Sequence, residues 1–560
     1  MSKLAAGTFE GTAPGHNGDI TVALTTDGER ITDLKLVKEQ ETPHVGDNAL
    51  KWLPEAIVKN QSVGVDAVSG ASFTSRGIIN ATKKALEAAG GKVEDWDKHV
   101  PKPLVAAKDQ IADVVIAGGG LTGLASAAFA AEKGLKVVVI EKNDQVGGSF
   151  RYAAGAFATC GSSQAEDNQV DDLVAWVKEL NRHGAKKEMN YDFLHYLEEN
   201  SGKAFDDLCQ ITGLKGQKIQ DAPYKVLTPG PGALVTERLE AYIKDHGGLI
   251  LPDTVITKVL TDGSHAAGIM AKNASGSFKI TAKYVIIATG GASAGHRDWL
   301  EKETPALANV HVFNEANPAN TGDGYGILKE AGADFYGHEY YKNAFLDFGW
   351  PLRIYYANVP DYSKAILVNA DAKRFTNEAP FFVLNLTTAL YYEGSPRYYL
   401  IYDAKTMDQD FRKKLDNQQE DPKVVVHAQT IEELAKKLSL DPEALAQTFA
   451  DYQKACETGQ DEFGKDQAHL EKFDGSEGYY GLYVMPGCWG TIGGVKINQE
   501  FQVEKTDGSY FDNLYALGEM STSELFSDFY IAGFSLANYF TEAKLLAEKL
   551  DKWCIWINSW

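Results

Sequence analysis

A glycine-rich turn is the clearest chemical feature of the sequence. Gly118, Gly120 and Gly123 form a G-x-G-x-x-G pattern directly after the apolar run at 112–117. The first glycine permits a tight bend, the second lets the backbone approach a pyrophosphate, and the third allows close helix–strand packing. The following helix N-terminus offers free N–H groups to phosphate. Glu141 ends the next apolar run, where an acid binds a ribose hydroxyl, so the spacing predicts a dinucleotide site.

A second stretch, DAVSGASFTS at residues 66–75, combines one acid with small and hydroxyl side chains. Ser72 supplies a hydroxyl nucleophile, and Gly70 and Ala71 leave space around it. The alternative interpretation is a plain serine-rich turn that caps a helix beginning near Arg76.

Aromatic side chains are concentrated at 337–362, GHEYYKNAFLDFGWPLRIYYANVPDY, and recur at a few later positions. Aromatic rings make flat apolar walls, and a tyrosine adds a polar group. Any single one of them is more often a core residue. Together they favour a flat, largely apolar ligand. The later positions are Phe381, Phe382, Trp489, Phe529 and Tyr530.

Composition excludes several classes of protein. The formal charge of −22, from 55 Lys and Arg against 77 Asp and Glu, disfavours nucleic acid and anionic membranes as partners. Five scattered cysteines without a CxxC pair indicate a reducing compartment, and the twelve histidines show no ligand spacing, so no metal is expected. The absence of an apolar leader or a run of about 18 apolar residues predicts a cytoplasmic protein without a membrane span.

The elements that must position these residues fall into several domains, because 560 residues exceed one core. Alternating residues at 7–37 predict strands, and 76–89 predicts a helix that ends at Gly90-Gly91. We therefore expect a small α+β domain at 1–98 and a linker at 99–110.

From residue 111 the pattern changes to a strand, a helix and a second strand, which is typical of a doubly wound α/β sheet. Further apolar strands follow at 284–291 and 513–520, whereas from about 339 to 490 the strand rhythm is lost. We expect a Rossmann-like domain interrupted by an inserted α+β capping domain. The predicted parts are 111–338 and 491–550 for the Rossmann-like domain, 339–490 for the cap, and 551–560 for a tail without an assigned role.

Three distant stretches, EKNDQVGGSF, IIATGG and LYALGE, resemble the FAD-binding fold of the fumarate reductase/succinate dehydrogenase flavoprotein superfamily, which includes flavocytochrome c and urocanate reductase-like enzymes. The resemblance covers about 111–550 and implies non-covalent FAD, with the helix N-terminus at 532–536 facing the flavin pyrimidine. No second G-x-G-x-x-G accompanies a βαβ pattern, so no NAD module is expected. The implied FAD contacts are Gly118, Gly120, Gly123, Glu141, Lys142, Gly147, Gly148, Ser149, Ala288, Thr289, Gly290, Asp323, Gly518, Glu519, Gly533, Ser535 and Leu536.

Residues 1–98 resemble the FMN-binding domain of flavocytochrome-type reductases and bacterial respiratory flavoproteins. In that family the pattern D-x-x-[ST]-G-A-[ST] carries FMN in a phosphodiester on its last hydroxyl, attached by a flavin transferase. The resemblance implies covalent FMN on Ser72, within a recognition pattern that contains Asp66, Ser69, Gly70 and Ala71. Two flavins imply that FMN takes electrons from an external donor, such as an NADH:flavin reductase, and passes them to FAD.

The residues that hold a dicarboxylate in this family are replaced here. The proton-donating arginine corresponds to Phe382, the first histidine of H-H-T-x-G-G to Trp489, and the carboxylate-binding arginine to Tyr530. Bidentate Arg–carboxylate contacts are lost with these changes, so fumarate reduction is not expected. We expect substrate contacts from Phe382, Trp489, Gly490, Thr491, Phe529 and Tyr530.

We therefore expect a reductase of a C=C bond in an aromatic or polycyclic enone or enoate, with hydride from flavin N5. Tyr530 is the first candidate proton donor, followed by Tyr362 and Tyr341. Three alternatives stay open. The first is a dehydrogenase that desaturates a ring ketone and resembles 3-ketosteroid dehydrogenases. The second is a urocanate-type or monocarboxylate enoate reductase, in which Arg353 and Lys342 bind the single carboxylate. The third is an electron-transfer flavoprotein without a small-molecule substrate.

Overall fold

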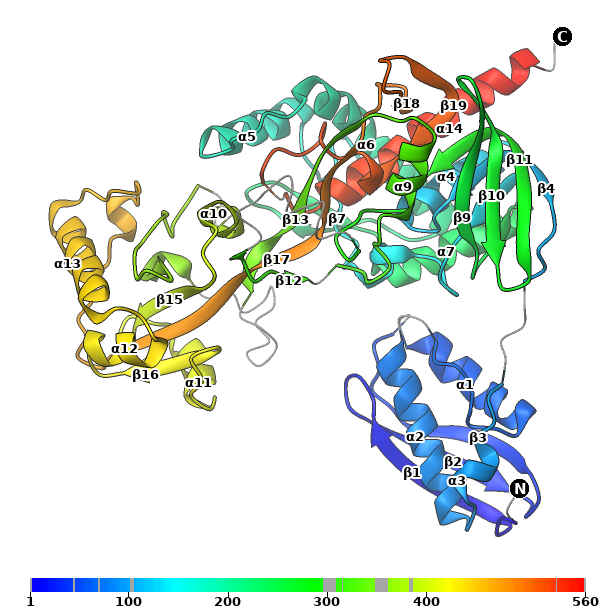
Figure 1. Cartoon of the computed structure of the whole chain (residues 1–560), viewed down its shortest axis with the longest axis horizontal. Coiled ribbons are helices and arrows are strands. Elements are labelled where there is room, and N and C mark those ends of the chain that lie inside the picture. The colour runs from blue at the N-terminus through cyan, green and yellow to red at the C-terminus, as the bar shows by residue number, and fades with distance from the viewer. Residues whose placement is uncertain are drawn as a thin grey trace.

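The structure is a computed structural model of the chain (Figure 1). It describes residues 3–43, 46–68, 71–100, 105–295, 309–314, 316–347, 361–381, 386–529 and 531–557. Among the helices of these ranges, none combines the length and the apolar composition needed to cross a membrane. Within the same ranges, no group of three His, Cys, Asp or Glu side chains is placed to hold a metal ion.

The N-terminal unit is a three-stranded antiparallel sheet covered by helices. Strand β2 alternates buried and less buried positions, so Ile20, Val22 and Leu24 face the helices and are fully buried. These residues belong to a core that contains only residues of this unit. The elements are β1 (Gly7–Pro14), β2 (Asp19–Thr26), β3 (Ile31–Lys38), α1 (Asp47–Asn60), α2 (Ser72–Ala88) and α3 (Val93–Trp96).

The second unit is the predicted doubly wound α/β domain, and this fold class is confirmed. Its parallel strands lie in the order β19-β11-β4-β5-β8, with β18 antiparallel at one edge and β9 and β10 continuing from β11 as an antiparallel meander. The strands are β4 (Gln110–Ala117), β5 (Val137–Ile140), β8 (Leu249–Leu251), β9 (Val255–Asp262), β10 (His265–Asn273), β11 (Gly276–Ile287), β18 (Gln502–Glu504) and β19 (Tyr510–Ala516).

Helices pack on this sheet because their small residues allow close approach. Helix α4 is almost entirely buried, with the sequence LTGLASAAFAAE, and it contacts α7 and α14. Helix α14 also contacts α6, so the C-terminal helix closes the domain that α4 begins (Figure 1). The helices are α4 (Leu121–Glu132), η1 (Gly148–Tyr152), α5 (Val170–Arg182), α6 (Tyr191–Thr212), α7 (Gly232–Asp245), α9 (Asp323–Glu330), η7 (Gly518–Met520) and α14 (Phe534–Ile557), and a small hairpin is formed by β6 (Gln217–Gln220) and β7 (Val226–Thr228).

The inserted cap is a six-stranded sheet with helices, as expected of an α+β domain, and its strands lie where the sequence lacks a strand rhythm. Strands β15 and β17 are buried on both faces and rich in tyrosine, and they therefore lack the apolar–polar alternation that marks a half-exposed strand. The cap elements are β12 (Phe313–Asn314), β13 (Phe335–Asp347), η4 (Tyr362–Lys364), β14 (Ala365–Asn369), α10 (Leu386–Glu393), β15 (Tyr398–Asp403), α11 (Gln409–Asp416), β16 (Val425–Ala428), α12 (Ile431–Leu438), α13 (Pro442–Thr458), η6 (Gln467–His469) and β17 (Tyr479–Val495).

One strand joins the cap to the α/β domain. Residues 479–484 of β17 pair with β15 in the cap sheet, whereas residues 485–495 pair with β13 (Figure 1). The expected boundaries at 338/339 and 490/491 therefore fall inside β13 and β17 rather than in loops.

Candidate functional site

A large cavity lies at the carboxyl ends of the parallel strands. The space between its walls, open solvent at the mouth included, is about 930 Å³. The turn after β4, the end of β5, the loop after β11 and the first turn of α9 all contribute to it. Of the residues expected to contact FAD, its lining contains Gly118, Gly120, Glu141, Lys142, Gly148, Ser149, Ala288, Thr289, Gly290, Asp323, Glu519 and Leu536.

The three glycines of the turn act in different ways. Gly118 has a φ of +107°, and a Cβ there would overlap the Ala288 carbonyl oxygen. A Cβ on Gly123 would overlap the Gly118 carbonyl oxygen, so this glycine serves packing and does not line the cavity. A Cβ on Gly120 would meet nothing within 4 Å, so this residue borders open space. That space, next to the N-terminus of α4, fits a pyrophosphate.

Glu141 borders the cavity at the end of β5. Its Oε2 accepts a hydrogen bond from the Gly119 N–H at 2.9 Å, and its Oε1 accepts one from the Asn143 N–H at 2.8 Å. Burial raises the pKa of Glu141, although these two N–H groups counteract it. The donors hold the carboxylate in one orientation, as required of a group that accepts a ribose hydroxyl.

The loop at 317–323 also borders the cavity, and most of its contacts were missed from the sequence. Lys142 Nζ lies 2.8 Å from Asp323 Oδ2 and donates to Thr321 Oγ1 at 2.6 Å, which connects the β5 loop to the N-terminus of α9. Asn317 and Asn320 also line the cavity. The turn-rich run N-P-A-N-T-G-D-G at 317–324 was the available signal.

Glu519 joins the cavity to strand β17. Its Oε1 accepts from the Thr491 N–H at 2.8 Å, and its Oε2 accepts from Asn320 Nδ2 at 3.3 Å. Burial raises the pKa of Glu519 to about 7 despite these donors. Thr491 Oγ1 accepts from the Ala292 N–H at 2.9 Å, so a residue expected to contact substrate lies beside the cavity wall.

Four other residues expected to contact FAD do not line the cavity themselves but are close in sequence to residues that do. Gly518 has a φ of +68°, and its N–H donates to Glu542 Oε2 at 2.7 Å. Gly147 has a φ of +115° and precedes η1. Gly533, with a φ of +85°, and Ser535 lie at the start of α14. These four residues shape the turns from which the lining residues project.

The expected substrate residues fall on two adjacent segments. Trp489, Gly490 and Thr491 lie on β17, and Phe529 is buried in the loop before α14. The two segments are held together because the Gly493 N–H donates to Thr522 Oγ1 at 2.9 Å. Two further expected residues, Phe382 and Tyr530, lie outside the described residues, as does Arg353.

The other two candidate tyrosines occupy different environments. The Tyr341 backbone is paired with Gly490 in the β13–β17 ladder, whereas Tyr362 is 1% exposed in the core of the cap and does not line the cavity. The position of Tyr362 corresponds to a packing role, because aromatic residues of the cap supply most of its large buried side chains. Lys342 follows on β13, where its backbone is paired with Cys488.

A row of aromatic rings connects the α/β domain to the cap. The Phe381 ring lies parallel to the His183 ring, with centroids 4.8 Å apart and an interplanar angle of 3°. Trp176 lies 6.4 Å from Phe381 and 4.8 Å from Tyr224, and Tyr224 lies 5.8 Å from Phe534 at the start of α14. The Tyr224 hydroxyl donates to the Ala532 carbonyl at 2.9 Å. This row reaches from the helix N-terminus beside the cavity to the segment that precedes Phe382.

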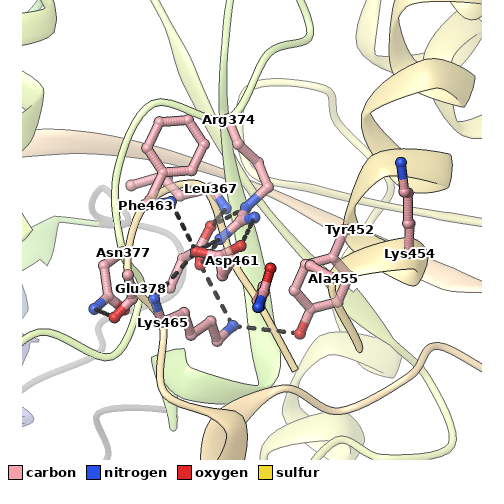
Figure 2. A network of polar contacts seen from close by, with 12 residues as sticks. Leu367, Arg374, Asn377, Glu378, Tyr452, Lys454, Ala455, Asp461, Phe463 and Lys465 are labelled. Carbon is pink, nitrogen blue, oxygen red and sulfur yellow. Dashed lines mark hydrogen bonds and ion pairs between the residues drawn. The ribbon is translucent and has the colours of Figure 1, made fainter. Parts of the chain in front are cut away.

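Figure 2 shows four charged side chains buried together in the cap. Arg374 donates to Glu378 through Nε and Nη2 at 2.9 and 2.8 Å, and to Asp461 through Nη1 at 2.6 Å. Lys465 Nζ lies 3.4 Å from Glu378 and donates to the Ala365 carbonyl at 2.9 Å. Burial favours the neutral acid, but Arg374 holds the pKa of Asp461 below its usual range. The network fixes the segment that ends four residues before Phe382.

The predicted attachment serine is accessible. Ser72 is exposed and is the first residue of α2, so the helix begins four residues earlier than predicted. No side chain caps it, because the Ser75 hydroxyl instead accepts from the Val68 N–H at 3.0 Å. Asp66 is partly exposed 4.0 Å from His99 Nδ1, and Ala71 is buried. Ser69 and Gly70 lie outside the described residues.

Comparison with known proteins gives two family matches. Residues 113–527 match the FAD binding domain family, and residues 15–87 match the FMN-binding domain family.

Three relatives are similar over most of the chain. The NADH:acrylate oxidoreductase of Vibrio harveyi is 23% identical over 98% of this chain and 61% of its own length, so the chain spans less than two thirds of that relative. The urocanate reductase of Eggerthella lenta is 26% identical, with coverage of 92% and 87%. The vinyl phenol reductase of Lactiplantibacillus plantarum is 25% identical, with coverage of 74% and 91%.

Two solved structures share the fold. The 3-ketosteroid Δ1-dehydrogenase of Sterolibacterium denitrificans aligns with a TM-score of 0.62 and 17% identity, covering 79% of this chain and all of that one. An open conformation of a flavocytochrome c3 fumarate reductase aligns with a TM-score of 0.58 and 21% identity, covering 79% and 78%. At these identities the likeness concerns the fold alone.

Proposed function

Because the chain belongs to the FAD binding domain family of flavin-dependent oxidoreductases, and also carries an FMN-binding domain, we propose that it reduces an activated C=C bond. Electrons would enter from an external donor through FMN attached to Ser72 and pass to non-covalent FAD. The observation that carries the proposal is the contact of Thr491 on β17 with Glu519 in the cavity wall. It brings the segment that binds substrate in the resembled family next to the FAD site.

The proposed acceptor is an enone or enoate with an aromatic or polycyclic body. Trp489 takes the place of a histidine that binds the dicarboxylate in the resembled family. Phe529 directly precedes Tyr530, which takes the place of a carboxylate-binding arginine. The half-exposed Phe381 ring adds flat apolar surface between the cap and the helix N-terminus, with Trp176 and the buried Tyr224 behind it. Such surfaces bind planar apolar molecules and offer little to a second carboxylate. The names of two relatives, a urocanate reductase and a vinyl phenol reductase, support a ring conjugated to the double bond.

The residues of the chain have distinct parts in the proposed reaction. Bound FAD would supply a hydride to the β-carbon of the acceptor. We assign protonation of the α-carbon, or a hydrogen bond to the carbonyl oxygen, to the Tyr530 phenol, because it replaces a substrate-binding arginine beside α14. Tyr341 is the second candidate, since its backbone is paired with Gly490. The cap, anchored by β17, excludes water from the reacting atoms.

Maturation and supply of electrons require partners. We propose that a flavin transferase attaches FMN at Ser72 and that an NADH-dependent flavin reductase or a similar donor reduces it. A cytoplasmic location fits this chemistry, and within the described part of the chain Cys160, Cys209, Cys456 and Cys488 form no disulfide.

Anaerobic stopped-flow absorbance tests the proposal. Reduced enzyme should be reoxidised by aryl enoates and enones at least about tenfold faster than by fumarate, because the ionic contacts for a second carboxylate are replaced. Tyr530→Phe should slow this step while flavin content stays unchanged. Reoxidation by fumarate alone would refute the assignment of substrate class.

Two other results would identify the alternative functions. Desaturation of a ring ketone by oxidised enzyme, without reduction of any enone, would favour a dehydrogenase. Indifference to every small acceptor, together with rapid exchange with a protein partner, would favour an electron-transfer protein.

A further inference from the structure

The phenylalanine that follows the predicted attachment serine is unusually exposed. Phe73 is 61% exposed in the first turn of α2, although aromatic side chains normally bury most of their surface. The exposed ring of His16 lies next to it, with centroids 5.9 Å apart and an angle of 45° between the rings. The two rings therefore form a small open aromatic surface beside Ser72.

We propose that Phe73 and His16 form the resting surface for the isoalloxazine ring of the FMN carried by Ser72. This inference depends on the proposed attachment at Ser72. The tether consists of a phosphate and a five-carbon ribityl chain, so the flat ring must settle on surface close to the serine. Stacking on an aromatic side chain removes apolar surface of both partners from water.

A buried carboxylate joins the two backbone segments that carry these rings. Glu41 is 7% exposed, and its Oε1 accepts from the His16 N–H at 2.9 Å and the Asn17 N–H at 3.3 Å. The hydroxyl of Thr74, next to Phe73, donates to Glu41 Oε2. One side chain thus connects the β1–β2 turn to the first turn of α2. The aromatic surface is built from two segments that are far apart in the sequence.

The β1–β2 turn is shaped around this carboxylate. A Cβ on Gly15 would lie 2.4 Å from Glu41 Oε1, so a larger residue there would displace the carboxylate from its present position. The approach brings the exposed His16 ring next to Phe73. The surface is therefore positioned by tertiary contacts and does not depend on the local sequence around Ser72 alone.

A tryptophan placed on this surface reports contact with the ring. Indole quenches flavin emission by electron transfer at contact distance, whereas phenylalanine and histidine do not. We expect Phe73→Trp and His16→Trp holoenzymes to lose FMN fluorescence by about fivefold relative to the native chain, since the indole would lie against the ring. His16 lies outside the recognition pattern for attachment, so His16→Trp keeps the test valid if Phe73→Trp impairs flavinylation. Tyr510→Trp, an exposed aromatic position on β19, is the matched control and should leave emission unchanged.

Intact mass separates failure of this inference from failure of the proposed function. Flavinylated chains of Phe73→Trp and His16→Trp whose emission equals that of Tyr510→Trp would overturn the resting surface while leaving the attachment at Ser72 intact. Chains without a mass increment, produced in a host that has the flavin transferase, would refute the attachment itself and the resting surface with it. Iodide quenching gives a second measurement. Phe73→Ala and His16→Ala should each raise the quenching constant of FMN by up to about twofold, because one face of the ring is uncovered.

Discussion

Replacing Arg374 with methionine tests how the buried charges support the cap. In the native chain Arg374 and Lys465 face Glu378 and Asp461, so the four charges balance (Figure 2). All four side chains are at most 7% exposed. Methionine keeps much of the length of the arginine stem but removes its charge and its hydrogen bonds, which leaves one carboxylate in excess.

The expected loss of stability follows from the close spacing of the four buried charges. Unit charges about 4 Å apart interact by about 4 kcal/mol at an effective dielectric constant of about 20. Loss of one partner from a buried ion pair costs about 3–5 kcal/mol in other proteins. Repulsion between Arg374 and Lys465 is relieved at the same time, so we expect a loss of about 3–5 kcal/mol of unfolding free energy in the cap. For a unit of this size that lowers the midpoint by about 6–20 °C.

Calorimetry and hydrogen exchange of the β14 and β15 amides measure this effect, with FAD content as the check that the α/β domain is intact. Arg412→Met is the control, because Arg412 pairs with the half-exposed Glu477 on the cap surface and should cost no more than about 1 kcal/mol. Arg374→Met/Glu378→Met should recover part of the loss, since Lys465 and Asp461 then remain balanced. A midpoint for Arg374→Met equal to that of the control would refute the reasoning.

Further outcomes follow from the cavity and its surroundings. Gly120→Ala should leave the fold intact and weaken FAD binding by about tenfold or more in titrations of apoprotein, because its Cβ would enter the open space expected for the pyrophosphate. Gly123→Ala should instead lower the thermal midpoint of the α/β domain itself, since its Cβ would overlap the Gly118 carbonyl; equal midpoints for the two variants would contradict this. Burial raises the pKa of Glu542 from 4.5 to about 8, so its contribution to stability is full below pH 4.5 and is lost as the pH rises through about 8. Glu542→Gln should therefore flatten the decline of the unfolding midpoint over that range, and an unchanged slope would assign the decline to other groups.

Local chemistry explains how much of the site could be predicted from the sequence. The glycine turn and Glu141 were identifiable because phosphate and ribose contacts restrict a few residues at fixed spacing. The resemblance to the flavoprotein superfamily is confirmed by the family match over residues 113–527. In contrast, the run at 317–324 indicates only a turn, and the sequence does not show that Asn317 and Asn320 of this turn line the cavity.

The features that the sequence did not predict depend on tertiary contacts. The cap was expected to be α+β, but its individual strands could not be located because burial on both faces removes the period-two pattern. Tyr362 was a reasonable candidate acid by residue type, but it lies in the core of the cap. The helix begins at Ser72, inside the DAVSGASFTS stretch, and the hydroxyls of Thr74 and Ser75 bind Glu41 and the Val68 N–H instead of capping it.

Strand β17 belongs both to the cap and to the surroundings of the flavin cavity. Leu482 belongs to the cap core, and Thr491 on the same strand binds Glu519 in the cavity wall. Its ladder with β13 is interrupted opposite Pro486 and Cys488, where the register shifts. The cap core and the cavity wall are thus joined by one continuous strand, and the irregular part of its ladder lies between Leu482 and Thr491.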